Sequence, residues 1–435
     1  MAPVTLDVPP FVSFIIHRLN AAGYETYVVG GAVRDALLGR SILDWDVGTA
    51  ASAERIRSIF RDQRQFSIRH GTVTMVHSGA HFEVTPFRGP GNDLVSDLSR
   101  RDFTINAMAF DPEQSEVIDP FCGKKDLKQR ILRAVGSPEE RFREDPLRLL
   151  RCIRLSADLR FCIEKETLGG LSGTAPLLSS VASERVRDEL IKILMTHRPS
   201  PYFYLMARTG VLKSFLPELL EGYLKRQNHY HRYTIFRHIV ETVDYVREDP
   251  LLRVTALLHD IGKPRTRIKK EGTWRFYGHE KESARMAEEI LKRLRFSREI
   301  TQKASHLIRH HMIGYSSAWS DAAIRRLIQR VGPGRITDLL ELRRADLMAH
   351  GLGDQHLNLL EELERRVEEE MRQGPPLQRR ELAVDGNTVM RVAGLLPGPE
   401  VGKILQHLNE KVLDHPELNN PEDLTALIQS MGTSA

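Results

Sequence analysis

The sequence predicts an α+β domain, a mixed sheet with helices, followed by an all-α remainder. Up to about residue 135, β-forming runs alternate with helical periodicity in the order strand, helix, strand, helix, strand, strand. From about Pro138 onward the pattern is helical almost without interruption. A chain of 435 residues is too long for a single hydrophobic core, and Pro/Gly-marked breaks fall at residues 198–201 and 374–376.

The elements of the N-terminal domain are expected in the following order along the chain. A helix leads into the first strand, which ends at a glycine pair, and a short helix opens directly after that pair. The other expected elements are the leading helix from Phe11 to Ala22, a helix over residues 54–64, and strands over residues 71–77 and 81–87.

The composition is typical of a soluble globular protein, with 41% hydrophobic and 28% charged residues. A formal net charge of +5 suits a polyanionic partner, although an excess of this size does not establish nucleic-acid binding. The three cysteines form an odd number without metal-binding spacing, which favours a reducing compartment. Neither a signal peptide nor a membrane-spanning segment is recognisable, so we expect a cytoplasmic protein without membrane contact.

The stretch from Val28 to Thr49 combines features of a phosphate site and a metal site. Its apolar run ends in Gly30-Gly31, which opens a helix carrying Arg34. Glycine lets a ligand approach the backbone, and a helix N-terminus attracts phosphate. Asp44 and Asp46 follow in a strand-like segment, where residues i and i+2 face the same side. An Asp-x-Asp pair alone is more often two solvated acids, but beside such a turn it predicts a Mg²⁺–triphosphate site.

A basic pair, Arg100-Arg101, precedes a second candidate segment. The two arginines can neutralise phosphates, while Asp102 and Asn106, four residues apart at an expected helix start, can cap that helix and contact a ribose. A surface basic pair before an ordinary capped helix explains this segment equally well.

Arg148, Arg151 and Arg154 recur every three residues on a helix that begins after Asp145. Three like charges on one face cost stability unless an anion binds there, and a solvated basic face is the alternative. Asp145 and Arg148 together present one acceptor and a fork of donors, which can hydrogen-bond the edge of a base. We expect the helix over residues 183–190 to hold the arginine helix in place.

Histidines and aspartates of the second half match a hydrolytic metal centre. His259-Asp260 ends an apolar helix, TALLHD, so two adjacent ligands lie at the end of a buried helix. Imidazole and carboxylate ligands converging from separate helices are typical of such centres, whereas any one histidine alone is more often a surface or core residue. The pattern is similar to that of HD-domain phosphohydrolases, with room for a second metal. The candidate ligands are His238, His259, Asp260, His279, His311 and Asp346.

Taken in order, several motifs resemble those of the bacterial class II tRNA nucleotidyltransferases and their poly(A) polymerase relatives. The resemblance covers roughly residues 25–200, and the second half resembles members that carry a C-terminal HD domain. It implies a nucleotidyltransferase head, a helical neck with a nucleotide-template helix, an HD-type body and a tail that contacts tRNA. The motifs are GGAVRDALLGR, DWD, EVTPFR, RRDFTINAMAFDP, DPFCGKKDL, REDPLRLLRCIRL and SERVRDEL. The four expected parts are residues 1–137, 138–200, 201–350 and 351–435.

The resemblance also implies roles for the candidate residues. Asp44 and Asp46 would bind two Mg²⁺ ions that activate the RNA 3′-hydroxyl and hold the triphosphate, with Glu83 as a loosely supported third carboxylate. Asp145 and Arg148 would pair with the Watson–Crick edge of the incoming base. The HD centre would hold a divalent transition metal such as Mn²⁺ or Ni²⁺ and hydrolyse phosphomonoesters or 2′,3′-cyclic phosphates. The other implied nucleotide-binding residues are Gly31, Arg34, Arg101, Asp102, Asn106, Arg151 and Arg154.

One departure from the family pattern concerns the choice of nucleotide. In CCA-adding members, the segment between the equivalents of Arg88 and Arg100 contains a long flexible loop that helps the pocket switch from CTP to ATP. Here only GPGNDLVSDLS intervenes, without an arginine. This shortening resembles the CC-adding branch. We therefore expect addition of two cytidines from CTP to the 3′ end of tRNA, contact with its acceptor stem, and a separate enzyme that adds the adenosine.

Other functions stay open. Full CCA addition from CTP and ATP ranks second. Adenosine addition or poly(A) synthesis ranks third, because residues 68–73 follow the CCA type rather than the arginine-rich poly(A) polymerase pattern. A metal-dependent HD phosphohydrolase with a non-catalytic RNA-binding head and a non-enzymatic RNA-binding protein are further alternatives, although binding alone needs neither metal carboxylates nor a template pair. In the tail, the glycines of residues 394–405 suit either RNA phosphates or a packing turn.

Overall fold

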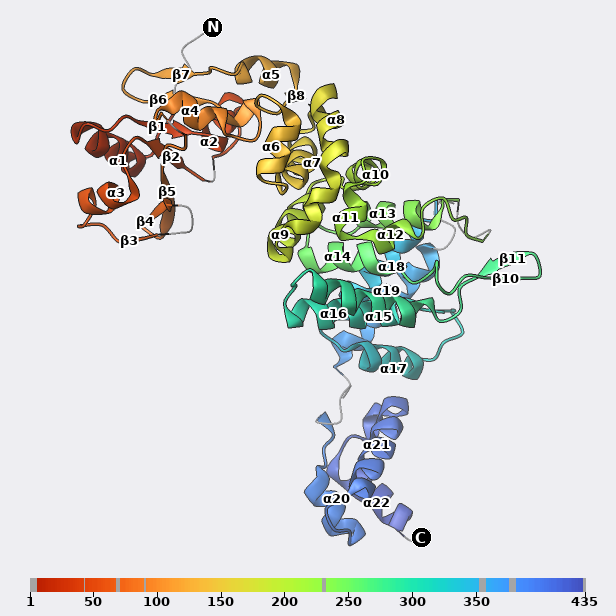
Figure 1. Ribbon diagram of the computed structural model, residues 1–435. Coiled ribbons are helices and arrows are strands. Elements are labelled where there is room, and N and C mark those ends of the chain that lie inside the picture. The colour runs from red at the N-terminus through yellow and green to blue at the C-terminus, as the bar shows by residue number, and fades with distance from the viewer. Residues whose placement is uncertain are drawn as a thin grey trace. The chain divides into compact units, whose positions relative to one another are not determined.

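The β-forming runs near the N-terminus assemble into a seven-stranded mixed sheet, as predicted (Figure 1). The computed structural model describes residues 6–42, 44–67, 71–89, 91–228, 232–351, 357–374 and 381–432. The strand order is β3-β4-β5-β2-β1-β6-β7, and neighbours are antiparallel except for the parallel pair β2 and β5. The strands are β1 (Thr26–Val29), β2 (Asp46–Thr49), β3 (Gln65–Ser67), β4 (Val73–His77), β5 (Ala80–Pro86), β6 (Ala109–Asp111) and β7 (Glu116–Ile118).

Helices pack on this sheet according to the alternation of its side chains. Val29 and Phe87 form an apolar cluster with Leu94 and Leu98, whereas Val28, the neighbour of Val29 in β1, points to the other face. Helix α3 (Ala53–Ile59) is shorter than the expected span of residues 54–64, because the chain turns after it into β3. The head helices are α1 (Pro10–Ala21), α2 (Gly31–Leu37), α3 (Ala53–Ile59), α4 (Leu94–Ser99) and α5 (Gly123–Gln129), with a 3₁₀ helix η2 (Thr104–Asn106).

The neck is helical as expected, and it is tied to the head by a short parallel ladder that the sequence pattern did not reveal. This ladder pairs β8 (Ile131–Leu132) with β9 (Cys162–Ile163). Arg154 donates to Glu189 over 2.7 Å, which supports the expected bracing of the arginine helix α7 by α9. The neck helices are α6 (Pro138–Glu144), α7 (Arg148–Leu159), α8 (Lys165–Thr174), η3 (Ala175–Ser180) and α9 (Ser183–Leu194). The helices that follow along the chain are α10 (Ser200–Arg208), α11 (Val211–Phe215) and α12 (Pro217–Leu220).

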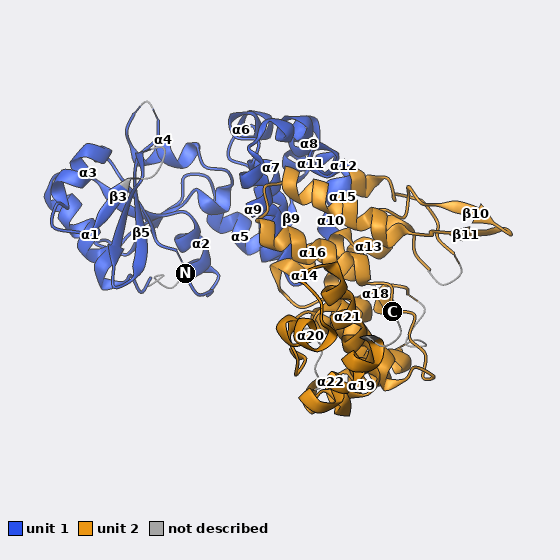
Figure 2. Cartoon of the chain, turned by 90° about the horizontal axis from the view of Figure 1, so that it is seen from below, with its two compact units in different colours: residues 1–217 blue, residues 218–435 orange. Residues whose placement is uncertain are grey.

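The chain divides into two compact units, residues 1–217 and 218–435 (Figure 2). In the second unit, α14 is buried along Leu252–Leu258 and runs directly into His259, as the sequence predicted. The helices of this unit are α13 (Ile235–Tyr245), α14 (Pro250–Leu258), α15 (His279–Arg293), α16 (Arg298–His310), α17 (Asp321–Val331), α18 (Ile336–Met348), α19 (Leu357–Gln373), α20 (Gly386–Ala393), α21 (Pro399–Asp414), η5 (Pro416–Leu418) and α22 (Pro421–Gly432).

A β-hairpin interrupts the expected helical run between α14 and α15. Strands β10 (Ile268–Lys270) and β11 (Thr273–Arg275) pair antiparallel around Glu271-Gly272. Both turn residues have positive φ, 50° and 75°, as a two-residue turn that follows the strand twist requires. Strands of three residues are too short to give a periodic signal, so only the Glu-Gly turn could have predicted this hairpin.

The C-terminal helices α20, α21 and α22 share an apolar core that includes Val389, Leu408 and Ile428. Gly394 ends α20 in the left-handed conformation at φ 67°, so the glycine-rich segment joins two packed helices. This geometry favours the packing-turn interpretation over a phosphate site. No helix among the described residues has the length and apolar character needed to cross a membrane.

We predict that Arg325→Ala destabilises the C-terminal unit by about 3–5 kcal/mol, because it leaves the carboxylate of Glu370 buried without its partner. Arg325 donates to both oxygens of Glu370, at 3.1 and 3.0 Å, and to the carbonyl of Leu413 at 2.7 Å. The matched control is Arg326→Ala. Its ion pairs with Glu410 and Asp414 are exposed, so it should cost no more than about 1 kcal/mol. Urea unfolding followed by tryptophan fluorescence measures both, and equal losses would contradict the prediction.

Candidate functional sites

Three carboxylates gather at the start of strand β2. Asp46 is the first residue of β2 and lies opposite Glu83 in the parallel register with β5. Asp44 precedes the strand, so the expectation that both aspartates belong to one strand is wrong, although their charges interact. Burial raises the pKa of Asp46, and Asp44 raises it further against the opposing effect of Arg101. Burial, Asp46 and Asp44 likewise raise the pKa of Glu83. Clustered oxygen ligands with raised pKa values fit a hard cation such as Mg²⁺.

Glycine is required at Gly30, where the chain passes beneath Arg101. Gly30 has a φ of 78°, and a Cβ atom there would lie 2.6 Å from Arg101 Nη1. This guanidinium donates two hydrogen bonds to Asp97 Oδ2, at 3.1 and 3.2 Å, which hold it beside the carboxylates. The candidate Gly31 has more room, because a Cβ there would meet its nearest neighbour, Arg34, at 3.6 Å. The first glycine at a strand-to-helix turn was the signal that could have identified Gly30.

Four of the candidate nucleotide-binding residues form one hydrogen-bonded chain. Arg34 Nη1 donates to Asn106 Oδ1 at 2.7 Å, and Asn106 Nδ2 donates to Asp102 Oδ1 at 3.0 Å. Arg151 completes the chain with two bonds to Asp102 Oδ2, at 2.8 and 2.6 Å. Their spacing predicted that Asp102 and Asn106 cap an α-helix. This prediction is wrong, because the chain makes only the 3₁₀ turn η2 there.

The chain's own carboxylates neutralise the arginine stripe of α7. Arg148 pairs with Glu144, Arg151 with Asp102, and Arg154 with Glu189. The anionic partners that the stripe was expected to need are thus present within the protein, on three separate segments of the chain. The exposed guanidinium of Arg185 binds Asp145 at 2.9 and 3.2 Å, and Arg148 also donates to the carbonyl of Arg100 at 2.7 Å. Both residues of the expected base-reading pair are therefore held by protein groups.

Four buried histidines of the second unit point the same nitrogen at one centre. The Nδ1 atoms of His259, His279 and His311 lie 2.7–2.8 Å from the backbone carbonyl three residues earlier, and Nδ1 of His238 lies 3.2 Å from the carbonyl of Ala349. A carbonyl only accepts, so each Nδ1 carries a proton, and Nε2 is the nitrogen that each ring offers to a metal ion. The Nε2 atoms of His238 and His259 lie 3.3 Å apart, an arrangement of two nitrogens that a shared cation stabilises.

The carboxylate of Asp260 bridges two groups of candidate ligands. Its Oδ2 lies 3.1 and 3.2 Å from Nε2 of His238 and His259, and its Oδ1 lies 3.3 and 3.6 Å from Nε2 of His279 and His311. The atoms of His238, His259, Asp260 and Asp346 lie within 4.8 Å of one another, as do those of Asp260, His279 and His311. Among the described residues, Asp260 Oδ1 and His279 Nε2 are buried without a hydrogen-bond partner. All six predicted ligands thus meet, and the donor set fits two divalent cations.

The charges of this centre compensate one another despite burial. Burial would lower the pKa of His259, but Asp260 and Asp346 raise it to about 10, so without a bound cation its Nε2 carries a proton that a metal ion would displace. Burial would raise the pKa of Asp260, but His259 and Lys263 hold it well below its usual range. Lys263, which forms an ion pair with Asp260 and donates to Gln227 at 3.1 Å, was missed from the sequence although it lies three residues after Asp260.

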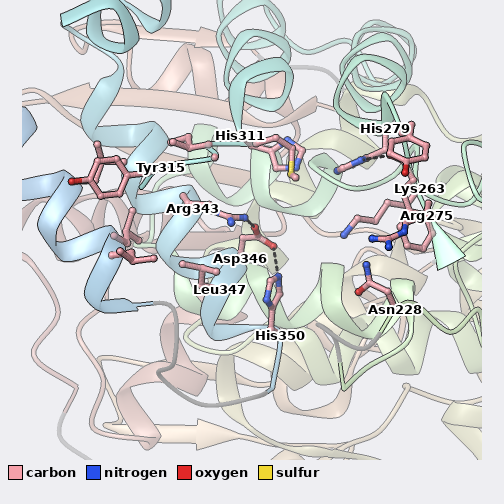
Figure 3. A pocket seen from close by; sticks show the side chains of 18 residues that line it. Asn228, Lys263, Arg275, His279, His311, Tyr315, Arg343, Asp346, Leu347 and His350 are labelled. Atoms are coloured by element: carbon pink, nitrogen blue, oxygen red, sulfur yellow. Dashed lines mark hydrogen bonds and ion pairs between the residues drawn. The ribbon is translucent and has the colours of Figure 1, made fainter. Parts of the chain in front are cut away.

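A cavity of about 480 Å³ opens beside this centre (Figure 3). Its wall includes the candidate ligands His279, His311 and Asp346, and Arg343 and His350 flank the carboxylate of Asp346. Lys263 and Arg275 contribute positive charge, and apolar side chains complete the wall. The apolar and aromatic lining residues are Phe276, Tyr277, Met312, Ile313, Tyr315, Leu347, Leu359, Leu360 and Leu363. A volume of this size accommodates a small ligand with an anionic group and an apolar ring.

Comparison with known proteins finds matches along almost the whole chain. The Poly A polymerase head domain family matches residues 26–133, the probable RNA and SrmB-binding site of polymerase A matches residues 160–222, and the HD domain family matches residues 231–349. The chain is 31% identical to the CCA-adding enzyme of Streptococcus thermophilus, over 96% of both chains. It is 34% identical to the A-adding tRNA nucleotidyltransferase of Deinococcus radiodurans, over 92% of this chain and 94% of the relative. The crystal structure of the Bacillus stearothermophilus CCA-adding enzyme in complex with CTP superimposes with a TM-score of 0.75 and 29% identity, covering 98% of each chain.

The carboxylate of Asp102 makes the stability of the N-terminal unit depend on pH. Burial would raise its pKa, but Arg151 and Asn106 lower it to about 2 from the ordinary 3.8. A depressed folded-state pKa contributes stability above the unfolded value, which is lost as the pH falls toward 2. We predict that this contribution is about 2 kcal/mol at neutral pH. The unfolding free energies of the native chain and of Asp102→Asn, measured in urea, should differ at pH 6, and the difference should shrink below pH 4 and disappear as the pH approaches 2. A difference that does not change with pH would contradict this assignment.

Proposed function

Since the chain belongs to the class II tRNA nucleotidyltransferases that carry a C-terminal HD domain, we propose that its head adds the two cytidines of the 3′-terminal CCA to tRNA from CTP. The observation that supports this reaction at this site is the cluster of Asp44, Asp46 and Glu83. Three mutually repelling carboxylates beside a positioned arginine match the needs of nucleotidyl transfer, in which a hydroxyl attacks a triphosphate and pyrophosphate leaves.

Asp44 and Asp46 would hold two Mg²⁺ ions, with Glu83 beside them. When bound, such ions supply charge neutralisation at the triphosphate and favour ionisation of the RNA 3′-hydroxyl. Arg101, fixed by Asp97, places a guanidinium next to these carboxylates, where it would bind a phosphate of the nucleotide. Gly31 and the network of Arg34, Asn106, Asp102 and Arg151 would receive the remaining phosphates and the sugar, while Arg154 braces the helix that carries Arg151.

Asp145 and Arg148 would recognise the base. Asp145 is one-third exposed and accepts two hydrogen bonds from a half-exposed partner, Arg185, so a nucleobase can replace that partner without opening the core. Arg148 is anchored at its Nη atoms by Glu144 and by backbone carbonyls of Arg100 and Arg141. This anchoring holds the guanidinium plane in a defined direction, as reading of a base edge requires.

The restriction to cytidine is supported by the short connection between β5 and α4. Shortly after β5, the backbone N–H of Arg88 donates to the side chain of Asp97 at 3.1 Å. At the start of α4, the side chain of Asp93 accepts a hydrogen bond from the backbone N–H of Ser96 and so caps the helix. Pro90 lies outside the described residues, as do residues 68–70, on which the ranking against poly(A) polymerases partly rests. A connection tied at both ends leaves little chain for the long loop that accompanies the change from CTP to ATP in the family.

Full CCA addition is the second candidate, and the names of the relatives favour it. The Streptococcus thermophilus relative is a CCA-adding enzyme over 96% of both chains. The Deinococcus radiodurans relative is an A-adding enzyme with 34% identity. Under the CC-adding proposal a separate A-adding enzyme completes the same tRNA, whereas under the alternative this chain also uses ATP.

An extension assay separates these two candidates. We predict that the purified protein with Mg²⁺ extends tRNA lacking CCA by two cytidines from CTP, and that it does not extend tRNA ending in CC with ATP. Asp44→Ala should lower incorporation by at least about 10³-fold, because the metal site loses a ligand. Efficient addition of adenosine to the CC-ending tRNA would overturn the CC restriction. Absence of incorporation from any nucleoside triphosphate would overturn the whole assignment.

For the second unit, we propose a metal-dependent phosphohydrolase that removes a phosphate from a damaged tRNA 3′ end. His238, His259, Asp260, His279, His311 and Asp346 would hold two divalent transition metals such as Mn²⁺ or Ni²⁺, supported by the four Nε2 atoms that face Asp260. When bound, such metals supply Lewis acidity to a phosphate ester. Lys263 and Arg343 add positive charge beside this centre. Hydrolysis would leave the free 3′-hydroxyl that nucleotide addition needs.

The two activities should respond to different substitutions. We predict that Asp260→Ala abolishes phosphomonoester hydrolysis in the presence of Mn²⁺ or Ni²⁺, because it removes the carboxylate shared by both ligand groups, and leaves cytidine incorporation within about twofold. Asp44→Ala serves as the reciprocal control, with hydrolysis retained and incorporation lost. Hydrolysis that survives Asp260→Ala would assign it to another part of the chain.

We further propose the division into head, neck, body and tail at residues 1–137, 138–200, 201–350 and 351–435, with tRNA as the partner of the tail. A cytoplasmic location is proposed from the three cysteines. Cys122, Cys152 and Cys162 are all free thiols, as a reducing compartment maintains them.

A further inference from the structure

The hairpin between α14 and α15 carries an unusual concentration of positive charge. Residues 265–277, here called the basic hairpin, contain five arginine and lysine side chains and one acid, Glu271. Strands β10 and β11 extend away from the helices of their unit in both views (Figures 1 and 2). All three residues of β10 are exposed. This surface belongs to neither the expected ligand set nor the nucleotide site of the head.

Acidic residues neutralise only part of the positive charge of the basic hairpin. Arg265 pairs with Glu221. By contrast, Lys269 and Lys270 form no ion pair with any residue that the structure describes, and both are exposed. Arg267 lies 3.5 Å above the ring of Trp274, and the ammonium of Lys269 lies 5.9 Å from the same ring. Like charges held together in this way lower the free energy of a bound polyanion.

Aromatic side chains accompany these cations. Trp274 is partly exposed between Arg267 and Lys269, and Tyr277 is 64% exposed. Alternating cations and ring faces are typical of single-stranded nucleic-acid surfaces, where phosphates meet lysine or arginine and bases stack on the rings. An acidic peptide would use the charge but not the exposed rings, so the combination favours a nucleic-acid strand.

The basic hairpin is continuous with the cavity of the metal centre. Arg275, Phe276 and Tyr277 line the cavity, and His279, a candidate metal ligand, follows two residues later (Figure 3). The cavity volume of about 480 Å³ is in the range for one small ligand, so one terminal nucleotide fits inside and the rest of a strand must lie on the rim. The basic hairpin forms part of that rim and provides the charge to hold the strand.

We propose that the basic hairpin binds the single-stranded 3′ end of an RNA and thereby directs the metal centre to a phosphate at the end of a strand rather than to a free mononucleotide. The inference rests on the phosphohydrolase function proposed for the second unit. In the reaction, a water oxygen forms a bond to phosphorus, the bond between phosphorus and the 3′-oxygen breaks, and a proton from water passes to that oxygen. The products are an RNA with a 3′-hydroxyl and inorganic phosphate.

Steady-state hydrolysis of two substrates tests this proposal. With Mn²⁺ or Ni²⁺, the full-length protein should cleave a 3′-phosphorylated pentaribonucleotide with a kcat/KM at least about tenfold above that for cytidine 3′-monophosphate. The double variant Lys269→Ala/Lys270→Ala should lose most of this preference through KM. The slope of log(kcat/KM) for the oligonucleotide against log[salt] should become shallower by about 1.4, the value for two lost phosphate contacts on a single strand. The mononucleotide, which does not reach these lysines, reports that the variant is folded.

The matched control is Lys292→Ala/Lys303→Ala. It removes the same charge from exposed positions on α15 and α16 that do not line the cavity, and it should leave the oligonucleotide preference intact. The proposal is overturned if the two double variants lose the oligonucleotide preference equally. It is also overturned if the hairpin variant keeps the preference of the native protein. If the native protein hydrolyses neither substrate, the proposed phosphohydrolase function fails instead. Fluorescence anisotropy of the labelled oligonucleotide then decides the inference, because a loss of affinity confined to the hairpin variant supports strand binding and equal affinities overturn it.

Discussion

The buried carboxylate of Asp102 is the interaction on which the N-terminal unit depends. It accepts two hydrogen bonds from Arg151 on α7 and one from Asn106, which in turn accepts from Arg34 on α2. The same few atoms therefore set the position of the neck helix against the sheet domain. Because the carboxylate is buried, hydrogen bonds from the protein rather than from water satisfy its oxygens and specify its geometry. The network thereby also positions the helix that carries Arg148 of the proposed base-reading pair.

The sequence was sufficient for the local features of both sites and insufficient for their long-range partners. The aspartates at the start of β2 and the buried helix that ends in His259-Asp260 follow from short patterns, and both were predicted. Glu83 could be suggested only loosely, since nothing local indicates that β5 pairs parallel with β2 and places Glu83 opposite Asp46. Two partners of the arginine stripe, Asp102 and Glu189, were missed for the same reason. Glu189 lies 35 residues from Arg154, and only the fold brings them together.

The histidine centre shows the same division between local and remote information. In His259, His279 and His311 the carbonyl that fixes the tautomer lies three residues earlier, at the end or beginning of a helix, so the chain orients these rings locally. For His238 the carbonyl belongs to Ala349, 111 residues away, so that ring is oriented only when the helical bundle has closed. Sharing of Asp260 between the two ligand groups also means that the two metal positions cannot be altered independently at this residue.

The ion pair between Asp145 and Arg185 changes how selectivity at the proposed base-reading site is to be understood. Asp145 is already satisfied before a nucleotide arrives, so an incoming base takes part in an exchange of partners rather than a simple association. A base with the right donors replaces the lost bonds and gains little net affinity. A base without them leaves the carboxylate unpaired, at a cost of about 1–3 kcal/mol. Discrimination at such a site comes from the penalty on the wrong base, and weak binding of the right one is compatible with high fidelity.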